Sequence, residues 1–146
     1  MQSTTDPALS GTGLYSEIQQ FYAHQMQLLD SGETDAWADT FTEDGVFAAN
    51  AHPDAKGRET IREAAGKAAA QRIGAGLQVR HWLGMLEVAA QEDGSARVRS
   101  YALVLNTPAG GAPAVHASTT CDDLLVRGED GAWLVAHRYI SRDDLR

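Results

Sequence analysis

The sequence predicts an α+β fold in which three N-terminal helices pack on one face of a curved, mostly antiparallel sheet. Two observations predict it. Apolar residues recur at helical spacing in the first half, and apolar and polar residues alternate between glycine-containing turns in the second half. A length of 146 residues is typical of one domain. We expect a disordered leader over residues 1–13, which lacks the apolar segment of a signal peptide, and one domain over residues 14–146.

The helices are predicted from apolar spacing and from the residues that end them. In the first helix, from residue 14 to residue 30, steps of three and four join Leu14, Ile18, Phe21, Tyr22, Met26 and Leu29. A second helix should run from Glu33 to Phe41, followed by a short strand "VFAAN" and a loop "AHPDAKG". An alanine-rich third helix is expected from Arg58 to Ile73, ended by "GAG".

Four strands are predicted in the second half, over residues 77–90, 95–106, 114–127 and 132–141. The segments between them, "QEDGS", "TPAGGA" and "GEDG", are typical of hairpin turns because each places glycine where a positive φ is needed. Consecutive strands joined by hairpins form an antiparallel meander.

Composition excludes several classes of protein. A net charge of −8, with Lys56 and Lys67 as the only lysines, argues against a surface that binds nucleic acid. No apolar run approaches the roughly 18 residues of a membrane span. The single cysteine, Cys121, excludes an internal disulfide and a site built from several thiolates. We expect a cytoplasmic protein.

A histidine lies in the middle of the first long strand. In "GLQVRHWLGMLEV", residues 76–88, alternation places on one face Leu77, Val79, His81, Leu83 and Met85. His81 therefore points toward the interior, where an imidazole without a hydrogen bond costs roughly 1 to 3 kcal/mol. We expect the sequence to supply a partner.

Asp30 is the best candidate for that partner. Tyr22, Met26 and Asp30 are four residues apart, so the carboxylate continues the inward stripe at the end of the first helix. An anion there is disfavoured by about 0.3 to 1 kcal/mol, which an inward imidazole would offset. Two interpretations stay open: Asp30 ends the helix half-exposed, or it accepts a hydrogen bond from His81 and makes the other ring nitrogen a general base.

The remaining histidines are His24, His52, His116 and His137. We expect His24 at the surface, His52 in a solvated loop and His137 in the core. His116 shares a strand face with the polar residues Ser118, Thr120 and Asp122. No pair has the spacing of a helical zinc motif, although ligands from separate strands would leave no such spacing. We expect no metal.

Three segments carry a resemblance: "QQFYAHQMQLLDSGETDAWADTFTEDGVF", "RHWLGMLEV" and "HASTTCDDLLVRGEDGAWLVAHRYISRDD". With the order of elements, they resemble the SnoaL-like branch of the NTF2-like superfamily over residues 14–142. That branch also contains scytalone dehydratase, a hexachlorocyclohexane dehydrochlorinase and polyketide tailoring enzymes. The resemblance implies a cone-shaped α+β barrel whose pocket serves many reactions.

The resemblance also implies roles for particular residues. In the dehydratase and the dehydrochlorinase, an aspartate ending the first helix pairs with a histidine on the first long strand, and Asp30 and His81 match those positions. Arg138 falls where the dehydrochlorinase has a pocket arginine. It would either point inward toward an anionic partner or a polar substrate, or be an exposed edge charge.

Other positions depart from scytalone dehydratase. Leu29 and Ala49 stand where it has two tyrosines that polarise the substrate, and Asn106 stands where it has a second histidine. Its serine and asparagine on the following strand correspond to Thr120 and Asp122. The general base is therefore kept while the electrophilic groups differ, which implies another substrate or reaction.

These observations predict a cofactor-independent enzyme that removes an acidic proton beside a carbonyl in a small, oxygenated substrate, and the resemblance implies that this substrate is an aromatic polyketide. His81 would be the base and Asp30 its orienting partner, and the outcome would be loss of water, ring closure or isomerisation. Expected substrate contacts are Tyr22, Trp37, Leu83, Met85, Asn106, Thr120, Asp122 and Arg138.

Two alternatives have no catalysis: a pocket that only binds a small molecule, or an interacting subunit like the small β subunits of ring-hydroxylating oxygenases. For partners, we expect the small-molecule substrate and, from the family, a homodimer or higher homo-oligomer formed through the outer face of the sheet.

Overall fold

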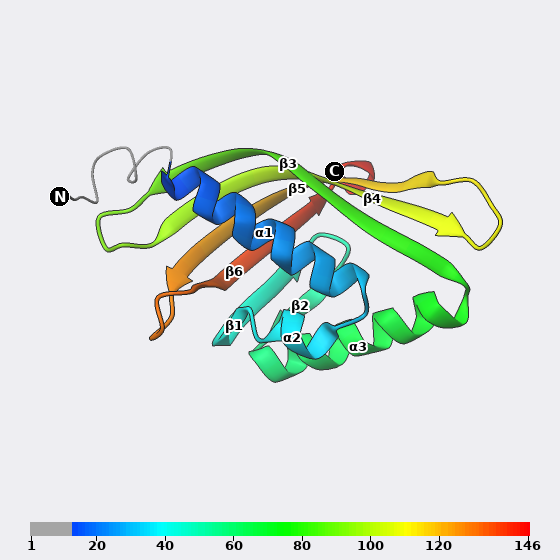
Figure 1. Cartoon of the computed structure of the whole chain (residues 1–146), viewed down its shortest axis with the longest axis horizontal. Helices are drawn as coiled ribbons and strands as arrows, with labels where there is room; N and C mark the ends of the chain where they lie inside the picture. Colours follow the sequence, from blue (N-terminus) through cyan, green and yellow to red (C-terminus); the bar gives the residue numbers. More distant parts are fainter. Residues whose placement is uncertain (1–12) are drawn as a thin grey trace.

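Six strands form one curved sheet in the computed structural model, which describes residues 13–146 (Figure 1). The strands are β1 (Phe41–Ala49), β2 (His52–Lys56), β3 (Leu77–Ala90), β4 (Ala96–Pro108), β5 (Ala114–Arg127) and β6 (Trp133–Arg142). Their order is β2-β1-β6-β5-β4-β3, and every neighbouring pair is antiparallel except β1 and β6, which run parallel. The predicted α+β fold is confirmed.

The helices are α1 (Leu14–Asp30), α2 (Thr34–Ala38) and α3 (Arg58–Gly74), with a short 3-10 turn, η2, at Asp143–Leu145. Figure 1 shows α1 lying across one face of the sheet, while α2 and α3 lie beside β1 and β2. None of the described helices combines the length and hydropathy that crossing a membrane would require. Residues 1–12 of the predicted leader lie outside the described part of the chain.

The hydrophobic core lies between α1, α2, α3 and the inner face of the sheet. The apolar stripe of α1 buries Ile18 and Tyr22, and the first turn of α3 adds Ile61. The largest core side chains are Ile18, Tyr22, Trp37, Phe41, Ile61, Val98, Leu125, Trp133 and Val135. Trp37 and Phe41 meet edge to face with 4.9 Å between their ring centroids. Of the two residues, only Trp37 is helical.

Two predicted segments have a different structure. The second helix ends at Ala38, and Phe41 begins a strand because the backbone N–H of Val135 on β6 donates to Thr40 O at 2.8 Å. The segment predicted as a loop contains β2, which pairs with β1 at Val46 and Lys56. Pro53 is tolerated there because β2 is an edge strand and needs few backbone donors.

Two register shifts reverse the expected direction of side chains. In β3, the pairing with β4 shifts between Gly84 and Glu87, and Met85 adopts a φ of 56°. Met85 is consequently 77% exposed, so the expectation that it faces inward is wrong. In β6, the pairing with β5 shifts between Val135 and His137, which exposes His137 and buries Arg138 to 3%. The expectation that His137 lies in the core is therefore also wrong.

Candidate active site

Asp30 and His81 meet where the end of α1 crosses β3. His81 Nδ1 lies 2.6 Å from Asp30 Oδ1, and the backbone N–H of His81 donates to Asp30 Oδ2 at 2.9 Å. The Asp30 side chain is only 7% exposed. Both carboxylate oxygens therefore have a donor from the same residue of β3, which offsets the unfavourable position of an anion at a helix C-terminus.

This contact sets the chemistry of the imidazole. A carboxylate accepts hydrogen bonds, so Nδ1 carries the proton and the lone pair is on Nε2. No residue in 13–146 forms a hydrogen bond with Nε2. The His81 side chain remains 22% exposed, and it borders the cavities described next. Nε2 is thus a basic nitrogen oriented by a fixed carboxylate.

A cavity of about 460 Å³ lies between α3, β1, β2 and the end of α1. Its wall is largely apolar, with Trp37, Phe47 and Ile61 among the contributors, while His52, Arg72 and His81 supply charged or titratable groups. An adjoining cavity of about 440 Å³ also has Arg72 and His81 in its wall. A mostly apolar pocket with a few converging polar groups is typical of a small-molecule site.

The structure places several predicted contact residues near His81. Trp37 shares the first cavity with it, and Asn106 shares the second. Leu83 and Tyr22 border a groove between α1 and β3 that also includes Asp30 and His81. His24 is exposed, as expected.

Met85, Thr120 and Asp122 lie elsewhere, in a depression on the outer face of the sheet. Thr119, Cys121 and Asp123 of β5 point inward, one position away from the residues chosen from the resemblance. Because side chains alternate along a strand, an offset of one residue moves a side chain to the opposite face. Thr120 and Asp122 therefore cannot contact a substrate bound beside His81.

Arg138 points inward, but its partners are protein groups. Its guanidinium donates to Asp123 Oδ1 and Oδ2 at 3.0 and 2.9 Å and to Gln25 Oε1 at 2.7 Å. The Tyr22 hydroxyl donates to the same carboxylate at 2.6 Å. Arg138, Asp123, Gln25 and Tyr22 form a buried network that joins α1 to β5 and β6. We expected Tyr22 and Arg138 to contact a substrate, but the polar groups of both side chains bind protein partners instead.

The network also holds its members in fixed charge states. Burial opposes the charge of Arg138, but the carboxylate of Asp123 outweighs it and raises the pKa of the guanidinium. Burial and the charge of Asp123 raise the pKa of the Tyr22 hydroxyl far above its usual range. Sequence reasoning missed Asp123 and Gln25, although Asp123 alternates with the apolar residues Cys121 and Leu125 and could have been found that way.

Within the part of the chain that the structure describes, no three His, Cys, Asp or Glu side chains converge as metal ligands would.

Comparison with known proteins identifies the family of this protein. The SnoaL-like domain profile matches residues 13–139. ActVI-ORFA from Streptomyces coelicolor is 38% identical, with a TM-score of 0.84 over 90% of this chain and 96% of that chain. A Catenulispora acidiphila structure in complex with S-DNPA is 38% identical, with a TM-score of 0.80 over 91% of this chain and 96% of that chain.

A more distant structure supports the fold alone. An NTF2-like protein with a cystatin-like fold from Novosphingobium aromaticivorans is 24% identical, with a TM-score of 0.78 over 97% of this chain and 93% of that chain. No curated protein matches the sequence. The match over most of the chain and the close agreement in structure show that the protein belongs to the SnoaL-like domain family, with an NTF2-like fold.

Proposed function

We propose that the protein is a cofactor-independent enzyme that removes a proton from carbon beside a carbonyl in a small, aromatic polyketide intermediate. The observation that carries the proposal is the hydrogen bond between Asp30 and His81, which leaves Nε2 as a free base at the wall of an apolar cavity. A base oriented in this way contributes about 10² to 10⁴ in rate.

The reaction follows from the positions of the two groups. Nε2 of His81 takes the proton from the substrate carbon, and the electron pair of the broken C–H bond moves to the carbonyl oxygen to form an enolate. The resulting imidazolium is stabilised through Nδ1–H by the Asp30 carboxylate. The enolate then expels an oxygen leaving group from the adjacent carbon, to which Nε2–H returns the proton, or, where a further C=C bond is conjugated with it, Nε2–H returns the proton to the far carbon of that bond. Neither route needs an external oxidant or reductant.

The family relationship supports the class of substrate. The Catenulispora acidiphila relative was solved in complex with S-DNPA, and it is 38% identical to this chain. The cavity beside His81 is large enough and apolar enough for an aromatic ligand.

Exchange of hydrogen for deuterium tests the proposal without knowledge of the natural substrate. A bicyclic aromatic ketone such as 2-tetralone is incubated with the protein in heavy water, and NMR follows the loss of the protons next to its carbonyl. His81→Ala should reduce the protein-dependent rate at least about 100-fold. Asp30→Asn should also reduce it strongly, because the amide oxygen would accept from the backbone N–H of His81 and the amide N–H would donate to Nδ1, which moves the ring proton to Nε2.

The matched control is His24→Ala, which removes an exposed histidine of α1 and should leave the exchange rate unchanged. Equal exchange by native protein and His81→Ala would exclude His81 as the base. Binding of the ketone without any protein-dependent exchange would instead indicate the non-catalytic binding protein.

A further inference from the structure

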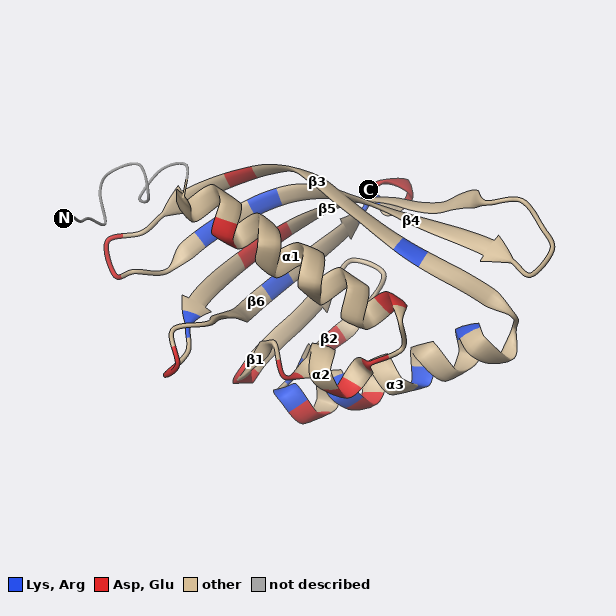
Figure 2. Cartoon of the chain, in the orientation of Figure 1, with Lys and Arg blue, Asp and Glu red and all other residues tan. Residues whose placement is uncertain are grey.

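The two cavities beside His81 differ in charge from the rest of the molecule. The chain has a net charge of −8, and acidic residues lie at many of its turns (Figure 2). Yet among residues 13–146 no aspartate or glutamate contributes to the wall of either cavity, whereas Arg72 contributes to both. The described part of this acidic protein therefore presents a cation, and no carboxylate, in the walls of these two cavities.

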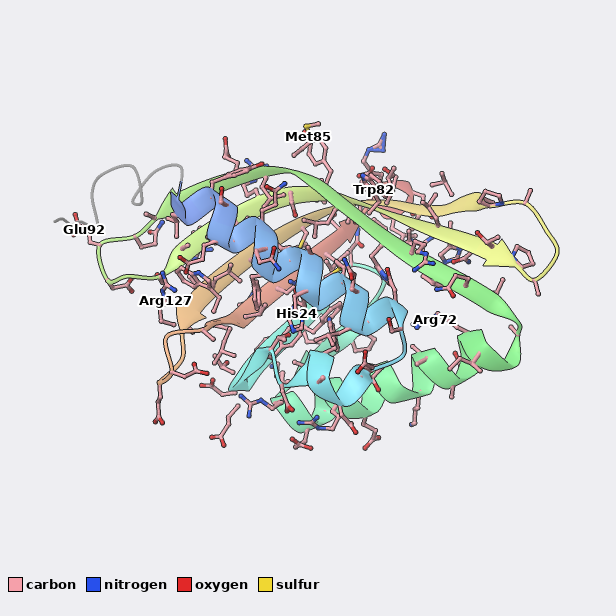
Figure 3. All side chains as sticks on the ribbon, viewed as in Figure 1. His24, Arg72, Trp82, Met85, Glu92 and Arg127 are labelled. Carbon is pink, nitrogen blue, oxygen red and sulfur yellow. The ribbon has the colours of Figure 1, made fainter. Side chains whose placement is uncertain are left out.

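Arg72 is held beside the Asp30–His81 pair. It lies in the last turn of α3, and its Nη2 donates to the backbone oxygen of Leu29 at 3.2 Å. Leu29 directly precedes Asp30, so this hydrogen bond fixes the guanidinium near the end of α1. Figure 3 shows Arg72 in the space bordered by α3, the end of α1 and β3. His81 approaches the same cavities from β3.

The donors of Arg72 are largely unused. A guanidinium has five N–H donors, and the only hydrogen bond that it makes to residues 13–146 is the one to Leu29. None of the ion pairs among those residues involves Arg72, whereas Arg62 and Arg138 both pair with carboxylates. A half-buried guanidinium against an apolar wall favours a planar anion, because the low local dielectric strengthens the attraction and two parallel hydrogen bonds can form.

We propose that the substrate carries a carboxylate that binds Arg72, and that this ion pair orients the acidic C–H bond toward Nε2 of His81. The inference rests on the proposed function and adds a substrate class to it: an aromatic acid whose carboxylate and reacting carbon lie on the same side of the molecule. Arg72 is then a residue that determines specificity, while His81 carries the proton transfer.

The test compares an acid with its neutral ester. Isothermal titration calorimetry measures the binding of 2-naphthylacetate and of its methyl ester to native protein, Arg72→Gln and Arg72→Lys. The matched control is Lys67→Gln, which removes a positive charge from the solvent side of the same helix, where the Lys67 side chain is 76% exposed.

We expect Arg72→Gln to weaken binding of the acid at least tenfold and to leave binding of the ester unchanged, which also shows that the variant is folded. Arg72→Lys should bind the acid with intermediate affinity, because an ammonium lacks the planar pair of donors. Lys67→Gln should bind both compounds as native protein does. Unchanged binding of the acid by Arg72→Gln would overturn the proposal. An equal loss of acid and ester would also overturn it, because the effect would then be one of shape and not of charge.

The result is independent of the deuterium-exchange test, because binding of naphthylacetate requires no proton transfer. If deuterium exchange depends on His81 but acid and ester bind equally well, the proposed function is supported and the carboxylate site at Arg72 is excluded. If the acid binds through Arg72 but no protein-dependent exchange occurs, the carboxylate site is supported and the proposed enzyme activity is excluded.

Discussion

At the scale of single residues, the stability of the interior depends on the buried ion pair of Arg138 and Asp123. The carboxylate accepts four hydrogen bonds, two from Arg138 and one each from Tyr22 and Cys121. The side chains of Arg138 and Asp123 are 3% and 0% exposed. Such a pair need not stabilise a protein more than apolar residues would, but removal of one member leaves an uncompensated charge in the interior.

Arg138→Met should therefore lower the free energy of unfolding by about 3 to 5 kcal/mol. The double variant Arg138→Met with Asp123→Leu should be more stable than Arg138→Met alone, because it removes the stranded charge. Urea unfolding followed by circular dichroism measures both values. Lys67→Met is the control, since the Lys67 side chain is 76% exposed on α3 and should contribute less than about 1 kcal/mol. If Arg138→Met lowers the free energy of unfolding no more than the control does, this account is contradicted.

At the scale of the element, the irregularity in β3 determines what the outer face of the sheet presents. Met85 is the only non-glycine residue with a positive φ among residues 13–146, and its side chain projects away from the helices (Figure 3). A left-handed backbone costs an ordinary L-residue about 1 to 2 kcal/mol, and it is worst for side chains branched at Cβ.

The stability of variants at Met85 should depend on how well the new residue tolerates a positive φ, and not on its hydrophobicity. Met85→Val should be less stable than Met85→Asn by about 1 to 2 kcal/mol, because asparagine tolerates a positive φ and valine does not. Thermal unfolding measures the difference. A more stable valine variant would show that β3 is regular at this position in solution.

The sequence predicted the elements whose signals are local. The bounds of β3 and β5 agree with the prediction because each strand lies between glycine-rich turns and alternates apolar and polar residues. Asp30 and His81 each lay on a predicted inward face, and their pairing depended on the resemblance. The sequence did not predict β2, because its strand conformation comes from backbone pairing with β1 and not from its own residues.

The errors at the site have three causes. Met85, His137 and Arg138 follow register shifts, which depend on how two strands meet and leave no clear mark in either strand alone. Thr120 and Asp122 were placed by resemblance, where an offset of one residue reverses the face. Arg72 was not selected, because arginine near the end of a helix is ordinarily a surface residue that interacts with the helix dipole.

At the scale of the whole molecule, the outer face of the sheet exposes large apolar side chains. Trp82 is 70% exposed, Tyr101 62% and Tyr139 41%, and Met85 lies beside the two tyrosines. Trp82 and Leu103 are cross-strand partners, so they share this face. A contiguous apolar surface of this kind typically marks an interface. We propose that a second copy of the chain covers it.

Trp82→Glu and Tyr101→Glu should each shift the protein from dimer to monomer, because both would place a carboxylate in the contact between subunits. Sedimentation velocity at micromolar concentration measures the change. Ile73→Glu is the control, since Ile73 is 70% exposed but lies on α3, away from the sheet's outer face. A native protein that sediments as a monomer would show that there is no such interface. Dissociation by Ile73→Glu alone would show that the interface lies elsewhere.

The position of β6 has a consequence for folding. β6 is the final strand in chain order, yet it lies between β1 and β5, and it pairs Val135 with the distant Phe41. Until it is in place, the β1–β2 hairpin and the β3–β5 meander have no backbone pairing that joins them. Contacts this distant in sequence close slowly. During synthesis, the complete sheet can therefore form only after β6 has been made. The cavity, whose wall takes Phe47 from β1 and His81 from β3, should be among the last features to form.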